Sequence, residues 1–343
     1  MEYRVLGRSG VKVSRLCLGA MMFGGATDAP TSERIIAQAR DAGFNFLDTA
    51  DGYNRGRSEE VVGQAIGAER HAWVLASKIA NPSGPNAALN EQGLSRAWIT
   101  RGVENSLRRL GTEHIDLLYL HREDHNTPLE VTVAALGDLI RAGKIRAFGL
   151  SNYRAWRIAA ICEACDRLGV DRPVACQPYY NAMNRMPEVE VIPVSVHYGL
   201  GVVPYSPLAR GVLTAKYKLG DAPLAESRAG RGDKRIMEAE WRPESLAIAQ
   251  RIAAYAAARG TSPAHLAIHW VLNNAMITGA IVGPRTEAQL ADYIAALAYR
   301  FTAEDEAMIS GEVAAGHPST PGYNDPNYPI EGRPVVVGGM GEA

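Results

Sequence analysis

The feature of this sequence that most constrains its fold is a regular alternation of short apolar runs with longer segments of helical periodicity. Asp48 and Lys78, which end two of these runs, are 30 residues apart, and the same separation holds for His121 and Ser151. A strand, a helix and the loops that join them need about this length, so each step indicates one strand–helix unit. The runs expected to form strands are, in chain order, 15–19, 44–48, 73–78, 115–121, 145–151, 174–177, 201–205 and 278–283.

Eight such units, built on apolar strands of the fully buried kind, predict an α/β protein with the architecture of a (β/α)8 TIM barrel. Two short alternating runs, Tyr3–Leu6 and Val11–Val13, predict a β-hairpin before the barrel. The polar stretch 220–240 predicts a long loop in the seventh unit. The tail from Gly316 is rich in Pro, Gly and Asn, so we expect either a flap or a disordered segment there.

Because one TIM barrel commonly runs to about 250 residues or more, a single domain is expected for the chain. This domain would span 1–343, with a barrel core at about 14–298 and a C-terminal loop and tail at 311–343. Helices are expected to start where a polar side chain or proline precedes a periodic segment and to end at a following glycine. The expected starts are Thr31 or Ser32, Ser58, Thr100, Pro128, Pro243, Ser262 and Thr286.

The composition excludes several classes of function. Hydrophobic residues make up 47% of the chain and charged residues 21%, so enough apolar side chain is present to exclude disorder as the main state. The 36 basic and 37 acidic residues nearly balance, which argues against a nucleic-acid or anionic-membrane partner. No run approaches the roughly 18 apolar residues of a membrane span, and the N-terminus lacks the apolar region of a signal peptide. A cytoplasmic location is therefore expected.

The four cysteines do not form a disulfide scaffold in a chain of this length. Cys162 and Cys165 make the only C-x-x-C, and no second Cys or His pair stands at zinc-finger spacing. Both thiols fall within an expected helix, so we interpret them as packing residues. Redox or metal chemistry at this pair is the alternative.

In a TIM barrel the active site lies at the carboxyl ends of the strands. A carboxylate, an ammonium and an imidazole stand at three of the predicted strand ends, in Asp48, Lys78 and His121. Any strand must end in a polar loop, but a complementary set of this kind favours a functional cluster. The remaining strand ends are Ser151 with Asn152, Gln177, Tyr205 and Gly283.

Motifs of several other chemistries are missing from the sequence. There is no G-x-G-x-x-G after a first strand, no Walker-type phosphate loop, no H-E-x-x-H and no G-x-S-x-G. His121 and His125 are spaced H-x-x-x-H, but in an expected loop this spacing does not place them on one face. A metal-dependent hydrolase is therefore a weak alternative, and no metal site is predicted.

Several segments carry a resemblance to a known family. They are FLDTADGY with Asp48 and Tyr53, ASK with Lys78, LH with His121, and then GLSN, VVPYSPLARG and IVGPRTEAQL. In this order the sequence resembles the aldo-keto reductase family from the hairpin to about Leu297. The opening GRSGVKVSRLCLGAMMFG and the long seventh loop resemble the branch that includes bacterial reductases and potassium-channel β subunits.

The chemistry of four residues fits such a reductase. Reduction of a carbonyl group needs a proton donor at its oxygen, and the ordinary tyrosine pKa of about 10 is too high for easy donation. We therefore expect Tyr53 to be the acid, Lys78 to lower its pKa, and Asp48 to hold Lys78 in place. His121 would hydrogen-bond the carbonyl oxygen and fix the angle of the substrate.

The resemblance implies NADP(H) as the cofactor. Ser151, Asn152 and Gln177 would bind the nicotinamide carboxamide, and Tyr205 would stack on the nicotinamide ring. The other residues matched to cofactor positions are Gly19, Ala20, Met21, Asp48, Ser206, Leu208, Gly211, Lys216, Arg228, Gly283, Arg285, Gln289 and Asp292.

Two features bear on the adenosine end of the cofactor. Arg285 precedes a predicted helix, where free backbone amides and a guanidinium would both favour the extra phosphate of NADP. Tyr293 stands where the family usually has asparagine.

The leading hypothesis is thus an NADPH-dependent reductase of a small-molecule aldehyde or ketone, with a bulky ketone as the expected substrate. A cofactor-binding regulatory or redox-sensing subunit with low turnover is the alternative.

Overall fold

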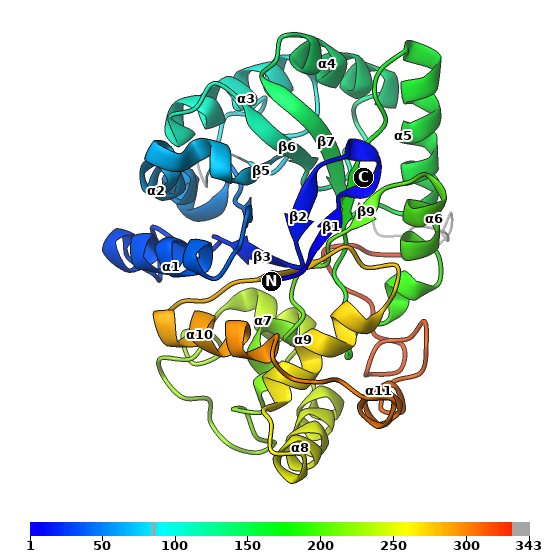
Figure 1. The fold of residues 1–343 in the computed structure, drawn as a ribbon. Coiled ribbons are helices and arrows are strands. Elements are labelled where there is room, and N and C mark those ends of the chain that lie inside the picture. Colours follow the sequence, from blue (N-terminus) through cyan, green and yellow to red (C-terminus); the bar gives the residue numbers. More distant parts are fainter. Residues whose placement is uncertain (83, 85–86, 331–343) are drawn as a thin grey trace.

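The barrel predicted from the sequence is present in a computed structural model of the chain, which describes residues 1–82, 84 and 87–330. Eight parallel strands form one sheet in the order β10-β3-β4-β5-β6-β7-β8-β9, and helices surround it (Figure 1). All eight predicted strands are found, so the (β/α)8 prediction is confirmed. The strands are β3 (Leu16–Gly19), β4 (Phe46–Asp48), β5 (Val74–Ile79), β6 (Ile115–Leu120), β7 (Ile145–Ser151), β8 (Ala175–Gln177), β9 (Gly201–Val202) and β10 (Ala280–Val282).

The barrel closes between its last two strands through few contacts. Val202 and Ile277 form an isolated parallel bridge. The Thr278 amide donates to the Val202 carbonyl over 2.8 Å, and the Ile281 amide donates to the Pro204 carbonyl over 2.9 Å. These bonds bring β9 and β10 together and complete the ring.

The predicted hairpin is also present, as β1 (Tyr3–Val5) and β2 (Lys12–Ser14), and it lies across the middle of the barrel in Figure 1. Gly7, between the two strands, has φ +50°, and a Cβ there would lie 2.3 Å from the Val174 carbonyl oxygen. Only glycine allows the hairpin to pack this closely against the amino ends of β8 and β9. The hairpin therefore covers the amino end of the barrel and leaves the carboxyl end for a site.

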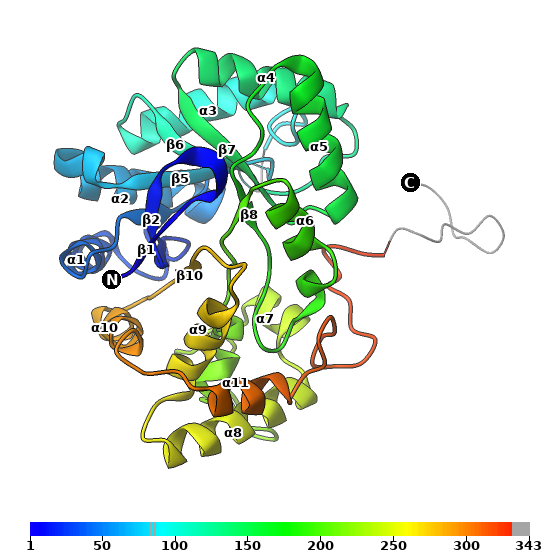
Figure 2. The same ribbon diagram turned by 45° about the vertical axis from the view of Figure 1, so that its right-hand side comes forward.

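Eleven helices are assigned in the described part of the chain. Figure 2 shows them from a second direction, with the C-terminal segment passing outside α7 and α11. They are α1 (Ala29–Asp41), α2 (Arg57–Ile66), α3 (Arg96–Leu110), α4 (Leu129–Arg141), α5 (Ala155–Leu168), α6 (Val191–His197), α7 (Lys234–Ala239), α8 (Pro243–Ala258), α9 (Pro263–Asn273), α10 (Glu287–Ala296) and α11 (Ala303–Ser310).

Some predicted helix starts were wrong. The first helix is capped by Asp28, whose carboxylate accepts from the Thr31 amide, and not by Thr31 or Ser32. The third begins at Arg96 and not at Thr100, because the Ser95 hydroxyl already accepts a hydrogen bond from the Trp98 amide. In both cases an earlier polar residue satisfies the free amides of the first turn, so the helix extends further toward its N-terminus.

The predicted long loop of the seventh unit contains a short helix that periodicity did not indicate. Asp233 caps α7, where its carboxylate accepts from the Ile236 amide. Two further helices, α6 and α11, were likewise not predicted.

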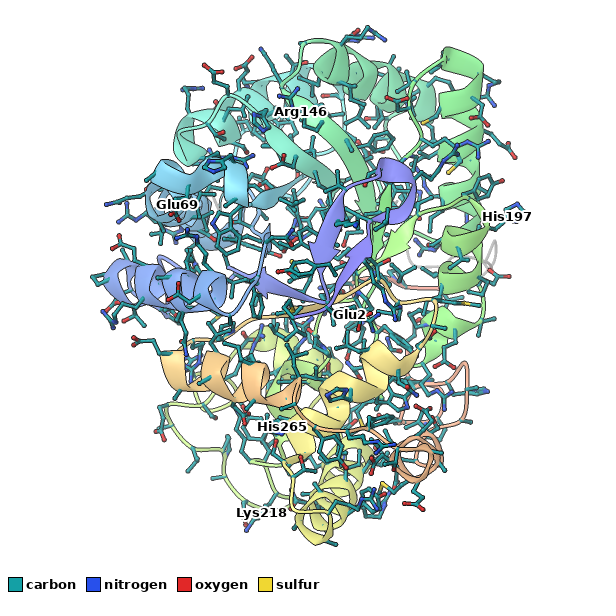
Figure 3. The ribbon with its side chains drawn as sticks, in the orientation of Figure 1. Glu2, Glu69, Arg146, His197, Lys218 and His265 are labelled. Atoms are coloured by element: carbon teal, nitrogen blue, oxygen red, sulfur yellow. The ribbon has the colours of Figure 1, made fainter. Side chains whose placement is uncertain are left out.

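The apolar side chains form two layers. One fills the barrel and includes Phe46, Tyr119 and Ile281, and a larger one lies between the sheet and the helices. Figure 3 shows charged or polar side chains such as His197 and Lys218 on the outside of the molecule. No helix within the described ranges is long and apolar enough to span a membrane.

All four cysteines are buried free thiols. Cys162 and Cys165 lie inside α5, where burial raises the pKa of Cys162 to about 11 and that of Cys165 to about 12. Such thiols are poor nucleophiles and poor metal ligands at neutral pH. Their burial in the α5 interface agrees with the packing interpretation.

Candidate active site

A buried ion pair lies at the carboxyl end of the barrel. Lys78, on β5, is 0% exposed, and its ammonium donates to the Asp48 carboxylate at the end of β4 and to the Thr49 carbonyl, the latter over 2.7 Å. The other Asp48 oxygen accepts from Gln177 Nε2 over 2.9 Å. Three strands therefore fix the position of one ammonium group.

Tyr53 stands over this ion pair. The Lys78 Nζ lies 4.7 Å from the centroid of the Tyr53 ring. The turn that carries Tyr53 continues through Asn54 and Arg55, which have left-handed φ values of 48° and 59°. Asn54 Nδ2 donates to the carbonyl of Met21 over 3.0 Å, and this bond holds the turn against its strain.

Burial and the neighbouring charges have opposite effects on the pKa values of Tyr53 and Lys78. Burial raises the pKa of Tyr53, and the positive charge of Lys78 opposes that shift without overcoming it. Lys78 acts in the expected direction, but the net pKa of Tyr53 lies above the ordinary value. For Lys78, burial lowers the pKa, but Asp48 and Tyr53 more than restore it, so the pKa of Lys78 is raised. Lys78 is therefore an ammonium ion at neutral pH.

His121 completes the set. Its ring meets the Tyr53 ring edge-on, with 5.7 Å between the ring centroids. Burial lowers the pKa of His121 well below its ordinary value, so the imidazole is neutral. Asn81 Nδ2 lies 3.0 Å from His121 Nδ1, and an amide nitrogen can only donate there. The ring hydrogen therefore sits on Nε2, which makes that nitrogen a donor.

Asn81 was missed by the sequence reasoning. It follows the predicted strand end Lys78 by three residues, and this position was the available signal. Its orientation depends on Ala80, whose φ of 133° lies where side chains other than glycine are rare. No sequence pattern indicates that conformation.

A cavity of about 600 Å³ opens above these groups. Asp48, Tyr53 and His121 lie at one end of it, whereas Lys78 is buried below the floor. Every predicted cofactor residue lines the cavity except Ala20, which is buried behind it. These lining residues are Gly19, Met21, Asp48, Ser151, Asn152, Gln177, Tyr205, Ser206, Leu208, Gly211, Lys216, Arg228, Gly283, Arg285, Gln289 and Asp292.

A rigid polar platform borders the reactive end of the cavity. Asn152, with φ 59°, donates to the His121 carbonyl over 2.8 Å and accepts from the Tyr205 hydroxyl over 2.8 Å. The Ser151 hydroxyl donates to the Gln177 carbonyl over 2.9 Å. The Tyr205 ring stacks on Tyr179, with 5.6 Å between centroids. The aromatic face is thus fixed in place before any ligand binds.

The other end of the cavity is lined by cationic side chains. Arg228 pairs with Asp233, with 2.7 Å between Nε and Oδ2. In the part of the chain that the structure describes, the other cations of this end make no ion pair; they are Arg210, Lys216, Arg231 and Arg285. Burial, followed by the charge of Arg231, lowers the pKa of Arg285. The crowding of like charges predicts an anionic ligand.

Two residues matched to the adenosine end of the cofactor already have hydrogen-bond partners within the protein. The Arg285 amide is not free, because it donates to Gln289 Oε1 over 2.8 Å. Asp292 lines the cavity but also lies 2.9 Å from His265 Nε2. Arg210 and Arg231 were not predicted; both line the cavity, and Arg210 has a left-handed φ of 52°.

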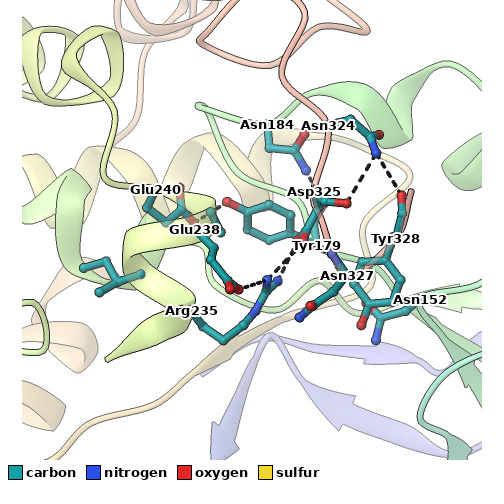
Figure 4. A network of polar contacts seen from close by, with 12 residues as sticks. Asn152, Tyr179, Asn184, Arg235, Glu238, Glu240, Asn324, Asp325, Asn327 and Tyr328 are labelled. Atoms are coloured by element: carbon teal, nitrogen blue, oxygen red, sulfur yellow. Dashed lines mark hydrogen bonds and ion pairs between the residues drawn. The ribbon is translucent and has the colours of Figure 1, made fainter. Parts of the chain in front are cut away.

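The C-terminal segment forms a wall of the site. Arg235, in α7, makes two hydrogen bonds to the Asp325 carboxylate, at 3.0 and 2.6 Å, as Figure 4 shows. Arg242 lies over the ring of Tyr323, 3.8 Å from its centroid. Tyr328 lines the cavity. Up to residue 330 the tail is therefore an ordered flap, and of the two predicted possibilities the disordered one does not hold there.

Comparison with known proteins finds relatives that match most of the chain. A probable voltage-gated potassium channel subunit beta from Oryza sativa subsp. japonica is 36% identical over 303 residues, which cover 87% of this chain and 91% of the relative. An uncharacterized oxidoreductase, YrpG, from Bacillus subtilis is 37% identical with the same coverage of both chains. A versiconal hemiacetal acetate reductase from Aspergillus parasiticus is 32% identical over 89% of this chain and 95% of its own.

The family model described as "Aldo/keto reductase family" matches residues 15–312, which is nearly all of the barrel and the α11 region. The resemblance found in the sequence, the eight-stranded barrel and these relatives agree, and the chain belongs to the aldo/keto reductase family.

Proposed function

We propose that this protein is an NADP(H)-dependent reductase that converts an aldehyde or ketone to the alcohol. The observation that carries the proposal is the arrangement of Tyr53 and His121 at the reactive end of one cavity, over the buried Lys78, with cations that form no ion pair in the described residues at the other end. A carbonyl substrate, as the hydride acceptor, would lie at Tyr53, and a polyanionic cofactor would lie along the cationic end. Together they would occupy both ends of the cavity. Membership of the aldo/keto reductase family makes oxidoreductase chemistry the starting point.

The residues present fit an adenine dinucleotide carrying an additional phosphate. Four cations without ion pairs face the cavity, where the lining carboxylates are Asp48, which Lys78 neutralises, and Asp292. Gly19 and Gly283 form part of the cavity wall, and because they have no side chains they leave room for a ligand to approach the backbone. Tyr205 would hold the nicotinamide face, and Ser151, Asn152 and Gln177 its carboxamide.

When bound, the nicotinamide supplies or accepts a hydride. Tyr53 then donates its hydroxyl proton to the carbonyl oxygen as the carbonyl carbon gains the hydride. Lys78 stabilises the phenolate that remains, and Asp48 keeps Lys78 charged and in place. His121, with its hydrogen on Nε2, donates to the same carbonyl oxygen and orients the substrate.

The deciding experiment is a steady-state assay of NADPH oxidation with a panel of simple aldehydes, sugars and bulky ketones. Turnover with any of them, lost in Tyr53→Phe, supports the proposal. The observation that supports the alternative function, a cofactor-binding subunit with low turnover, is the similarity to proteins named as potassium channel subunits beta. NADPH binding without turnover on the whole panel would support that alternative. A cytoplasmic location stays a prediction from the sequence.

A further inference from the structure

A second cavity, of about 440 Å³, lies next to the proposed reaction cavity. Two residues, Asn152 and Tyr328, line both cavities, so a single layer of side chains separates them. Figure 4 shows Asn152 beside Tyr328, which belongs to the C-terminal segment. Asn152 also donates to the His121 carbonyl, so it belongs to the polar platform beside His121. The second cavity therefore borders that platform.

Apolar side chains make up most of the lining of this second cavity. They come from the region after β8 and from the C-terminal segment, and six of them are Tyr153, Met186, Pro187, Val189, Val191 and Ile330. Three are left exposed to solvent: Met186 is 38% exposed, Val189 64% and Ile330 80%. Contact between water and apolar side chains that line a cavity is unfavourable. Covering these side chains with an apolar ligand therefore lowers the free energy.

The charged lining residues do not favour a charged ligand. Asp325 is held by two hydrogen bonds from Arg235. Arg154 is paired with Glu123, to which its amide also donates over 2.8 Å. Glu190, the third charged residue of the lining, is exposed to solvent, where water and salt screen its charge. The aliphatic and aromatic walls therefore determine what the cavity can bind.

Tyr328 lies between the two cavities, since it lines both of them. Its backbone is fixed, because its amide donates to the Asp325 carbonyl over 2.9 Å and its carbonyl accepts from Asn324 Nδ2 over 3.0 Å. Its hydroxyl makes no hydrogen bond to any residue in the described ranges. Among the described residues, no hydrogen bond of the hydroxyl therefore holds the ring in this position, whereas two backbone hydrogen bonds hold the segment that carries it.

We infer that the second cavity binds the apolar body of the substrate, so that this enzyme acts on aldehydes and ketones with an extended hydrocarbon chain. The inference rests on the proposed function, since the carbonyl group must lie at Tyr53 and His121 for its chain to reach Tyr328. The reactive group stays in the first cavity, and the hydrocarbon chain covers Met186 and Val189 in the second.

The test compares butanal, hexanal and octanal as substrates with NADPH. Each methylene that enters an apolar site contributes about 0.8 kcal/mol, which is roughly a fourfold increase in kcat/KM. If about three methylenes pass Tyr328, the kcat/KM for octanal should exceed that for butanal by about fiftyfold. If neither these aldehydes nor the sugars and bulky ketones of the wider panel are reduced, the proposed function fails. If members of the wider panel are reduced but none of the three aldehydes is, the function stands and the inference about the second cavity is overturned. If all three are reduced with equal kcat/KM, the function stands and the inference about the second cavity is overturned.

A pair of variants locates the effect. Val189→Asp places a charge on the rim of the second cavity at a side chain that is mostly exposed, and it should lower the octanal-to-butanal ratio at least tenfold. Val196→Asp makes the same change on α6 at a valine that is 43% exposed and does not line the cavity, so it should leave the ratio unchanged. A ratio that survives Val189→Asp, or that falls equally in both variants, contradicts the assignment of the hydrocarbon chain to this cavity.

Discussion

Asp51 is a buried carboxyl group that forms no ion pair with any residue the structure describes, and it should make the protein less stable as the pH rises. The residue is 4% exposed, and neither carboxyl oxygen has a hydrogen-bond partner among the residues that the structure describes. Burial, followed by the negative charge of Glu59, raises the pKa of Asp51 from 3.8 to about 8. Arg109 opposes this shift, but it already donates to Glu59 Oε2 over 2.7 Å.

The sign of the effect follows from the two states of the protein. Between pH 3.8 and about 8 the folded protein keeps the Asp51 proton and the unfolded chain has lost it. The free energy of unfolding therefore falls as pH rises, by about 1.4 kcal/mol per pH unit from this residue. Between pH 5.5 and 7.5 the loss is about 3 kcal/mol. Asp51→Asn keeps the shape of the protonated carboxyl and cannot ionise, so it should remove this loss.

The assay is urea-induced unfolding of wild type and Asp51→Asn at pH 5.5, 6.5 and 7.5. The difference in unfolding free energy should move in favour of Asp51→Asn by about 3 kcal/mol across this range. Asp221→Asn is the matched control, because Asp221 is exposed and the same substitution there should leave the pH dependence as in wild type. Parallel pH profiles for wild type and Asp51→Asn would show that Asp51 is already ionised in the folded protein, and the reasoning would be refuted.

Three further predictions concern the reaction and the cofactor. Tyr53→Phe should lower carbonyl reduction by at least about 10²-fold and leave NADPH binding near wild type, as measured by steady-state kinetics and fluorescence titration; activity within tenfold of wild type would contradict the role of Tyr53. Lys78→Met should collapse turnover and move the pH profile of any residual activity, because Lys78 no longer opposes the raised pKa of Tyr53; an unchanged profile would contradict this role. Arg285→Ala should weaken NADPH binding by about 1.5–3 kcal/mol and leave NADH binding nearly unaffected in the same titration; equal losses would place Arg285 against the part that both cofactors share.

The strands of the barrel could be predicted because most of their residues are buried and apolar, as the four buried residues of β3 (Leu16–Gly19) illustrate. The groups at strand ends followed from the same pattern, since parallel strands bring their carboxyl ends to one side. Asp48 and Lys78 are 30 residues apart in the chain and in contact in the barrel for this reason.

The residues that the sequence did not reveal depend on local backbone conformation or on distant contacts. Asn81 is oriented through the positive φ of Ala80, and Arg210 has a positive φ itself. Tyr328 reaches the site because Arg235 binds Asp325 and holds the tail in place. None of these conditions leaves a periodic trace in the sequence, because each concerns one dihedral angle or one pair of side chains.

The position of the C-terminal segment also sets an order of events during synthesis of the chain. All eight strands have been made once β10 is complete, and Tyr328 follows about 45 residues later. At about 5–20 residues per second, a ribosome needs roughly 2–9 s for this distance. During that interval a nascent chain can close its barrel around Tyr53 and Lys78 while Asp325 and Tyr328 are still missing. The segments that carry Tyr53 and Lys78 are therefore complete before the wall that separates the two cavities has been made.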